Sequence, residues 1–189
     1  GSQVGPTPTF FFDYSVKDLR RDITCCPFQW TKGVQTLQSF KSWSFGKLRY
    51  EWTNRMIPTG NDDGINRQYM RYADIVLMRA ELENELNGAS AAVPYLTKIR
   101  NRAFATSDRA TEVTAYVAEA ALSKEKMFQA IVDERAYEFA GELIRKADLI
   151  RWGMLKSKMD ETKNKMKAIV SLTDYDSKHP YSQLSGHAY

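Results

Sequence analysis

Apolar side chains recur at helical spacing from about Asn66 onward. The first stripe consists of Met70, Ala73, Val76, Leu77 and Ala80. Spacings of three and four residues place such side chains on one face of an α-helix. Asn87 and Gly88 follow the stripe, and glycine readily adopts the positive φ that often ends a helix. The pattern therefore predicts a helix over residues 70–87.

A second stripe begins after a short link and is formed by Val93, Leu96, Ile99 and Ala103. Ser90 is a suitable N-cap, and Pro94 falls in the first turn, where its missing N–H does little harm. This predicts a helix over residues 90–104. Because only two to three residues link the two helices, we expect them to form an antiparallel hairpin.

A third periodic segment starts at Ser123, another good N-cap. Its apolar stripe is Phe128, Ile131, Val132 and Phe139, and Gly141 then breaks the helix. A further apolar set follows, namely Leu143, Ala147, Leu149, Ile150 and Trp152. We predict a second hairpin that pairs residues 123–140 with 142–156, with fraying through Lys156 to Lys167. A short helix is also expected within Thr106 to Leu122.

The first sixty-six residues lack a sustained period, apart from a short helix expected around Ser15 to Asp22. They are rich in aromatic residues and turn signals, which indicates ordered loops over a core. The predicted fold class is all-α, with tetratricopeptide-like helical hairpins and an irregular, loop-rich N-terminal segment. We expect a single region in three parts, with the loop-rich segment at 1–66, the hairpins at 67–167 and a C-terminal tail at 168–189.

The charge pattern argues against a nucleic-acid partner. The 27 basic residues are interleaved with 23 acidic ones, which leaves a net charge of +4. Such mixing is typical of a solvated surface. No apolar stretch is long enough to cross a bilayer, and the first residues lack the pattern of a signal peptide. The adjacent Cys25 and Cys26 indicate neither a disulfide framework nor a zinc site.

Several acids repeat at four-residue spacing. Glu134, Glu138 and Glu142 would share one helix face, beside Asp133. The next helix offers Arg145, Asp148 and Arg151. We interpret Glu134, Glu138, Arg145, Asp148 and Arg151 as a structural ion-pair network between helices. The alternative is a pair of catalytic carboxylates for glycoside hydrolysis.

Other catalytic chemistry finds no support. The two histidines, His179 and His187, lie near the C-terminus, and no nucleophile, phosphate-binding or zinc-protease motif is present. The segment Asn61 to Gly64 resembles half of a calcium loop but lacks its further ligands, so we expect a surface turn. We expect no cofactor, no metal and no catalytic residue.

The tryptophans are the candidate ligand-binding residues. Trp30, Trp43 and Trp52 lie in loop-like sequence beside polar residues, and Tyr50 is close to them. An indole face can stack on the C–H face of a sugar, and loops can present it on a rigid base. The alternative is that these rings fix the loops onto the helical core. Trp152 lies at helical spacing and is expected in the core.

The stretch Arg71 to Glu81 and the blocks that follow it in order resemble the SusD/RagB family. The most recognisable block is Arg71 to Glu81, continued by Asn84 to Leu86. The blocks that follow in the family's order are Ile99 to Ala103, Ile131 to Arg135, Glu138 to Glu142, and Arg145 with Asp148 to Gly153. Family-like segments are also found at Asp18 to Arg21, Gly46 to Tyr50, His179 to Gln183 and Gly186 to Tyr189.

The resemblance implies an outer-membrane lipoprotein on the cell surface of a Bacteroidetes-type bacterium. It implies no enzyme activity but binding of oligosaccharide or polysaccharide, and delivery to a SusC-like TonB-dependent transporter. Family members are several hundred residues long, so the lipid-bearing N-terminal half is expected outside this chain. The proline-rich stretch usual before the family's C-terminal end is not recognisable after Lys167. Two other hypotheses stay open: a helix-pair scaffold that binds only protein, and a hydrolase. A peptide ligand also stays open.

Overall fold

The computed structural model describes residues 4–32, 34–38, 42–47 and 68–171. Contacts divide the chain into two compact units. We call Val16–Arg20 with Ile65–Glu142 the helical unit, and Gly1–Ser15, Arg21–Gly64 and Leu143–Tyr189 the mixed unit. The described elements are mostly helical, which confirms the predicted fold class.

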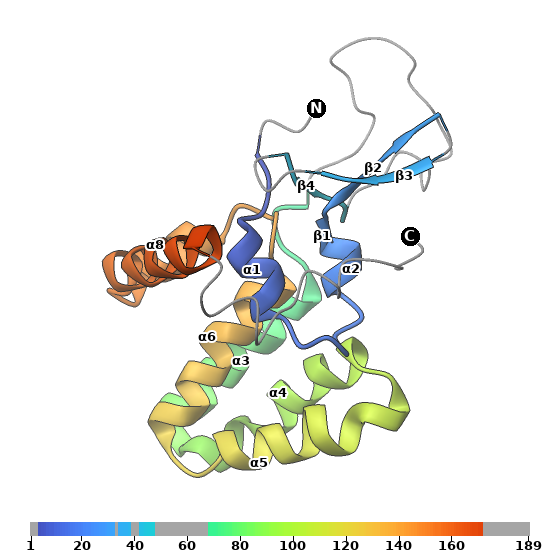
Figure 1. Ribbon diagram of the computed structural model, residues 1–189. Coiled ribbons are helices and arrows are strands. Elements are labelled where there is room, and N and C mark those ends of the chain that lie inside the picture. The colour runs from blue at the N-terminus through green and yellow to red at the C-terminus, as the bar shows by residue number, and fades with distance from the viewer. Residues whose placement is uncertain (1–3, 33, 39–41, 48–67, 172–189) are drawn as a thin grey trace. The chain divides into compact units, whose positions relative to one another are not determined.

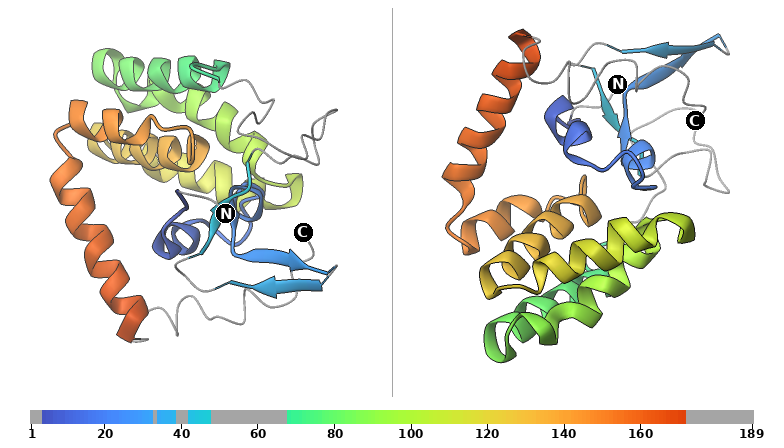
Figure 2. Two further views of the ribbon diagram at one scale, coloured as in Figure 1. Left: turned by 90° about the horizontal axis from the view of Figure 1, so that it is seen from above. Right: turned by 60° about the horizontal axis from the view of Figure 1, so that its bottom comes forward.

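The helical unit is built around the first predicted hairpin. Helix α3 (Tyr72–Asn87) and helix α4 (Ala89–Ala103) are joined by Gly88 alone, whose φ of 88° suits a residue without a side chain. The predicted hairpin is thus confirmed, although the second helix starts one residue before Ser90. The two helices lie side by side (Figures 1 and 2).

Their shared core is small and aliphatic. Ala73, Val76, Leu77 and Ala80 of α3 are buried, as are Leu96, Ile99 and Ala103 of α4. Met70, the first residue of the predicted stripe, precedes the helix and is exposed. The alanines let the two backbones approach closely, so a short link suffices.

The first helix of the second predicted hairpin is formed, but the helix predicted over 142–156 is not a single helix. Helix α6 (Lys124–Glu138) starts at the predicted N-cap, because the Ser123 Oγ accepts the Lys126 N–H at 3.2 Å. Its neighbours are α3, α4 and α5 (Tyr116–Ala120), and α5 continues a 3₁₀ turn (Thr106–Asp108) and a π-helical turn (Ala110–Ala115). The short helix expected before Leu122 is therefore the element that precedes and packs on α6.

The segment predicted as one helix over 142–156 is divided at Gly153 and begins only after a turn. Gly141 and Leu143 both have positive φ, at 79° and 65°. Beyond them lie α7 (Arg145–Arg151) and, after Gly153, α8 (Leu155–Ser171), both in the mixed unit. Helix α8 is continuous through the lysine-rich stretch where fraying was expected.

The mixed unit combines short elements with α8. Helix α1 (Pro8–Asp13) has proline at its first position, where the lost N–H has no helical partner, and α2 spans Arg21–Thr24. Strands β1 (Cys25–Cys26) and β4 (Ser44–Phe45) pair antiparallel, as do β2 (Phe28–Thr31) and β3 (Val34–Leu37). The helix expected around Ser15 to Asp22 is formed only from Arg21 onward, as α2, because Asp18 makes a β-bridge to Phe104 of the helical unit instead.

Candidate functional site

The predicted sugar-stacking residue Trp43 lies in the packed interior. It is only 3% exposed, and its ring contacts Phe11 edge-on with 5.6 Å between centroids. Its Nε1 donates to the Gln38 backbone oxygen at 3.1 Å. This corrects the expectation of an exposed ring, and Trp43 instead fixes its loop onto α1, as the alternative interpretation had it.

The other predicted aromatic residues are placed less fully. Trp30 belongs to β2, where it is paired with Gln35 of β3, but its side chain is outside the described part. Trp52 and Tyr50 lie outside the described residues. Their role in ligand binding stays a prediction.

Glu134 is the centre of a buried ionic cluster in the helical unit. Its side chain is 0% exposed, and its two oxygens accept from different arginines. Arg20 Nη1 lies 2.7 Å from Oε1, and Arg100 Nη1 lies 2.8 Å from Oε2. A buried carboxylate costs stability unless it is paired, and here both oxygens are satisfied.

Glu138, one helical turn later, gathers three more guanidinium contacts. Arg20 and Arg71 donate to it at 2.9 and 2.5 Å, and Arg102 also pairs with it. Burial by itself would raise the pKa of Glu138, but hydrogen bonds and charge from Arg71, with the charges of Arg20 and Arg102, hold that pKa below its usual value. Glu138 is therefore ionised at neutral pH.

Arg20 and Arg71 connect the cluster to segments outside the helices. Arg20 is held by both oxygens of Asp18, at 3.0 and 2.7 Å. Arg71, just before α3, makes a two-point contact with Glu142 at 2.8 and 2.9 Å. Charges of opposite sign thus fasten the start of α3 and the segment 16–20 to α6.

This geometry favours a structural role for the acids. Glu134 and Glu138 follow each other on one helix, and the arginines around them neutralise both. A general acid for glycoside hydrolysis needs a raised pKa, whereas the pKa of Glu138 is lowered. The alternative of two catalytic carboxylates therefore finds no support at this pair.

The pairing of Glu134 and Glu138 with Arg145 and Arg151 in the predicted network stays a prediction. The second half of that network lies in the mixed unit, where Arg151 pairs with Asp148 at 2.9 Å and stacks on Trp152. The Arg151 side chain is 42% exposed. Trp152, expected in the core, is half-buried. Arg145 starts α7.

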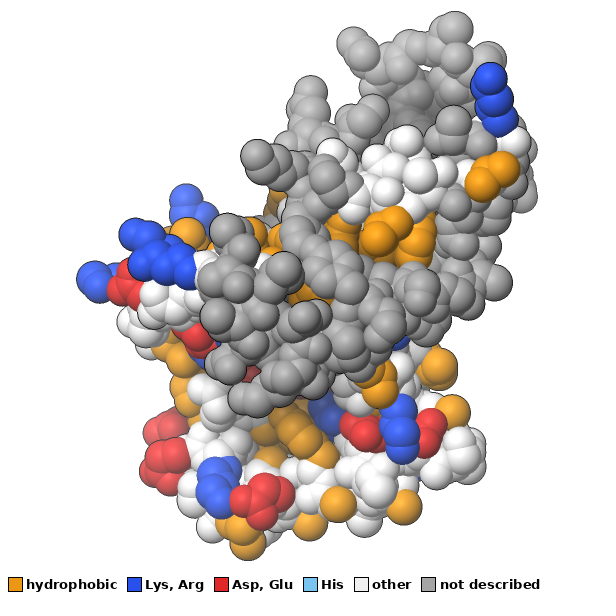
Figure 3. Space-filling model, in the orientation of Figure 1, with side chains coloured by type: hydrophobic (Ala, Val, Ile, Leu, Met, Phe, Trp, Pro, Cys, Tyr) orange, Lys and Arg blue, Asp and Glu red, His pale blue; other side chains and the backbone are white. Residues whose placement is uncertain are grey.

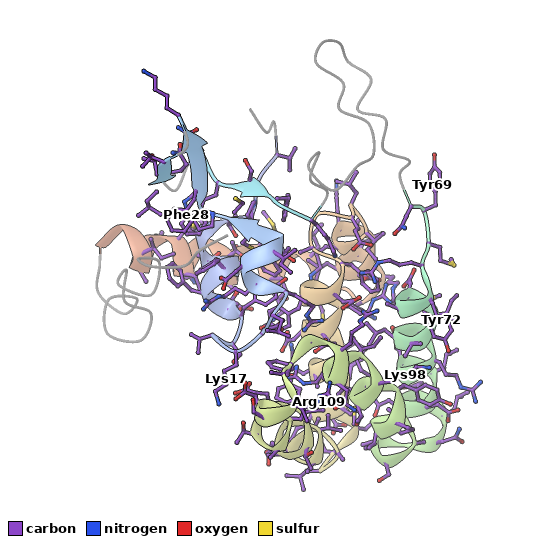
Figure 4. All side chains as sticks on the ribbon, turned by 90° about the vertical axis from the view of Figure 1, so that its right-hand side faces the viewer. Lys17, Phe28, Tyr69, Tyr72, Lys98 and Arg109 are labelled. Carbon is purple, nitrogen blue, oxygen red and sulfur yellow. The ribbon has the colours of Figure 1, made fainter. Side chains whose placement is uncertain are left out.

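The structure reveals an exposed aromatic face that the sequence analysis missed. Tyr69 is 96% exposed, and Tyr72 is also exposed at the start of α3. Lys98 of α4 donates to the Tyr72 hydroxyl at 3.2 Å and lies over its ring. Figure 4 shows Tyr72 and Lys98 on the α3–α4 hairpin and Tyr69 on the segment that precedes α3. We call Tyr69, Tyr72 and Lys98 the tyrosine face.

Three further observations concern metal binding, membrane spans and surface charge in the described residues. Among them, no group of three or more His, Cys, Asp or Glu side chains is placed to hold a metal ion. None of the described helices has the length and apolar character needed to cross a membrane. Over the helical unit, acidic and basic side chains lie next to each other (Figure 3).

These features define a helical protein with a surface suited to binding and with its buried acids committed to structure. The sequence model described as the SusD family matches residues 33–185, and the chain belongs to that family. Proteins of this family are binding proteins associated with the cell surface in Bacteroidetes.

Two relatives come from Formosa agariphila. SusD-like protein P25 is 48% identical over 90 residues, which is 48% of this chain and 16% of P25. SusD-like protein P2 is 28% identical over 156 residues, or 77% of this chain and 30% of P2. The chain thus spans less than a third of either relative. No solved structure matches this chain.

Proposed function

We propose that this chain is part of a glycan-binding protein that captures oligosaccharide at the bacterial surface and delivers it to a SusC-like TonB-dependent transporter. Membership of the SusD family is the observation that carries the proposal. The protein would be held at the outer membrane by a lipid on a part outside this chain. It would act by binding alone, without catalysis.

The tyrosine face supports this proposal from the described residues. A sugar ring presents C–H groups on its face and hydroxyls around its edge. Tyr69 offers an exposed ring, and the Lys98 ammonium and the Tyr72 hydroxyl offer hydrogen bonds farther along this face. Trp30, Trp52 and Tyr50 remain proposed stacking residues in addition to this set.

Binding of an oligosaccharide panel to the full-length protein tests the proposal. Calorimetry should show saturable binding of at least one glycan, and Tyr69→Ala with Tyr72→Ala should weaken it about tenfold, the loss of about 1.4 kcal/mol. Leu122→Ala, an exposed apolar residue outside the face, is the control and should bind normally. Normal glycan binding by the double variant would show that the tyrosine face is not part of the glycan site. Absence of any glycan binding would overturn the function.

A second candidate, a scaffold that binds only protein, is favoured by another stripe on α3. Ile75, Leu82 and Leu86 are exposed at spacings of seven and four, in line with Tyr72. Such a stripe is typical of a helix that packs against a partner. Co-purification with the transporter combined with no affinity for any glycan would favour this candidate, and Leu82→Lys should then release the transporter.

A further inference from the structure

A groove of about 510 Å³ lies within the helical unit, between the C-terminal part of α3 and the first turns of α6. Its volume falls in the range of small-molecule sites. The residues that line it are Glu81, Asn84, Glu85, Lys124, Glu125 and Phe128. None of them belongs to the ionic cluster or to the tyrosine face.

Asn84 is the residue that points to a ligand. It is 2% exposed, and its Nδ2 donates to the Lys124 backbone oxygen at 2.9 Å. That bond fixes the orientation of the amide, because a flip would bring two acceptor oxygens together. Its Oδ1 is buried and has no hydrogen-bond partner among the described residues. A buried acceptor without a donor is unfavourable, so this wall of the groove calls for a hydrogen-bond donor.

The side chains around Asn84 set the sign of the charge. Three carboxylates line the groove, against the single ammonium of Lys124, which lies 3.1 Å from Glu85. The pKa of Glu125 is lowered by its own backbone N–H and by Ser123, so it is ionised at neutral pH. The groove borders the C-terminal end of α3 and the N-terminal end of α6, whose opposite dipole charges offset each other. The acids therefore give the groove a net negative charge.

We infer that this groove binds a small organic ligand that carries a protonated amino group. An ammonium has three donors and no acceptor, which suits the free Asn84 oxygen and the surrounding carboxylates. The Phe128 ring supplies a wall that can contact the hydrocarbon part of the ligand or attract its charge. A metal ion fits less well, since among the described residues no three acids are placed to share one. The inference does not rest on the proposed glycan function.

Cyclohexylamine and cyclohexanol form a matched pair of probes at pH 7. They have similar size, but only the amine is protonated, as a lysine side chain would be. Neither is a sugar, so failure here leaves the glycan proposal untouched. We expect saturable binding of the amine by NMR titration, with shifts at Asn84 and Phe128, and at least about tenfold weaker binding of the alcohol.

Two charge reversals test where the amine binds. Glu85 and Glu119 are both exposed glutamates with one lysine partner, but only Glu85 lines the groove. Glu85→Lys should weaken amine binding by about tenfold or more, while Glu119→Lys should change it less than about twofold. Asn84→Leu should also weaken amine binding. If that variant unfolds, the result for Glu85→Lys decides whether the amine binds in the groove. No saturable amine binding, equal binding of both probes, or equal loss in both charge variants would overturn the inference.

Discussion

Different interactions stabilise the interior of the helical unit and the interior of the mixed unit. The helical unit buries side chains that form ion pairs, among them Glu134, Glu138 and Arg100. The mixed unit gathers aromatic rings, with Phe11 and Trp43 edge to face. Removing one member of the first group leaves a buried charge, whereas removing one of the second leaves mainly a void. The two units should therefore fail in different ways.

The largest effect should come from breaking the cluster at Arg100. Its Nη1 donates to Glu134, its Nε and Nη2 donate to the Glu112 backbone oxygen, and its guanidinium lies 3.7 Å from the centre of the Tyr116 ring. Arg100→Leu should cost about 3–5 kcal/mol in the free energy of unfolding, because Glu134 loses half of its pairing. Denaturant unfolding measures this loss.

Arg79→Leu is the matched control in the same hairpin. Arg79 pairs with Glu83 one turn away, and its side chain is mostly exposed. Its loss should cost less than about 1 kcal/mol. Equal losses in the two variants would mean that the cluster contributes no more than a surface pair.

A smaller loss is expected in the aromatic group of the mixed unit. Trp43→Phe keeps a ring against Phe11 but removes the hydrogen bond to Gln38 and some volume. We expect a loss of about 1–2 kcal/mol in the free energy of unfolding and no selective loss of glycan affinity. Unchanged stability together with weaker glycan binding would instead return Trp43 to the ligand site.

The pH dependence of stability should separate the two groups further. The pKa of Glu138 is lowered in the folded protein, so at mildly acidic pH the unfolded chain binds more protons than the folded chain. Its contribution is present above the ordinary glutamate pKa of about 4.3 and is lost as the pH falls through the folded value. Thermal midpoints measured from neutral pH downward should fall. Glu138→Gln should be less stable at neutral pH and should show a flatter fall in acid.

The sequence predicts features that depend on local signals better than features that depend on distant residues. The α3–α4 hairpin was predictable because its apolar stripes and Gly88 are local signals. The pairing of the acids with arginines was also predictable, but their partners Arg20 and Arg71 lie 118 and 67 residues before Glu138. Neither arginine belongs to a periodic stripe, so no local pattern identifies it.

Three features that the sequence analysis did not predict correctly also have identifiable causes. The helix predicted over 142–156 starts only at Arg145, because Leu143 adopts a positive φ that no local sequence signal predicts. The burial of Trp43 was equally hidden, since a tryptophan between polar residues suits either an exposed loop or a structural anchor. The tyrosine face was missed because Tyr72 belongs to the family-like block Arg71 to Glu81, which the sequence analysis interpreted as a packed helix. Tyr69 and Tyr72 lie three residues apart and outside the predicted apolar stripe. That spacing was the signal that could have identified the tyrosine face.

The smallest effect should come from an ion pair in the mixed unit that lies near the surface. Lys165 of α8 lies 2.7 Å from Asp13 of α1 and 2.9 Å from Glu161, and all three side chains are partly exposed. Water and salt screen such pairs, and ordering the long lysine side chain offsets part of the attraction. A double-mutant cycle with Lys165→Met and Asp13→Asn should give a coupling of about 0–1 kcal/mol that shrinks in high salt. The same cycle with Arg100→Leu and Glu134→Leu should give a clearly larger coupling that salt barely changes, because solvent does not reach those atoms. Equal couplings in the two cycles would show that burial does not distinguish the ion pairs of the two units.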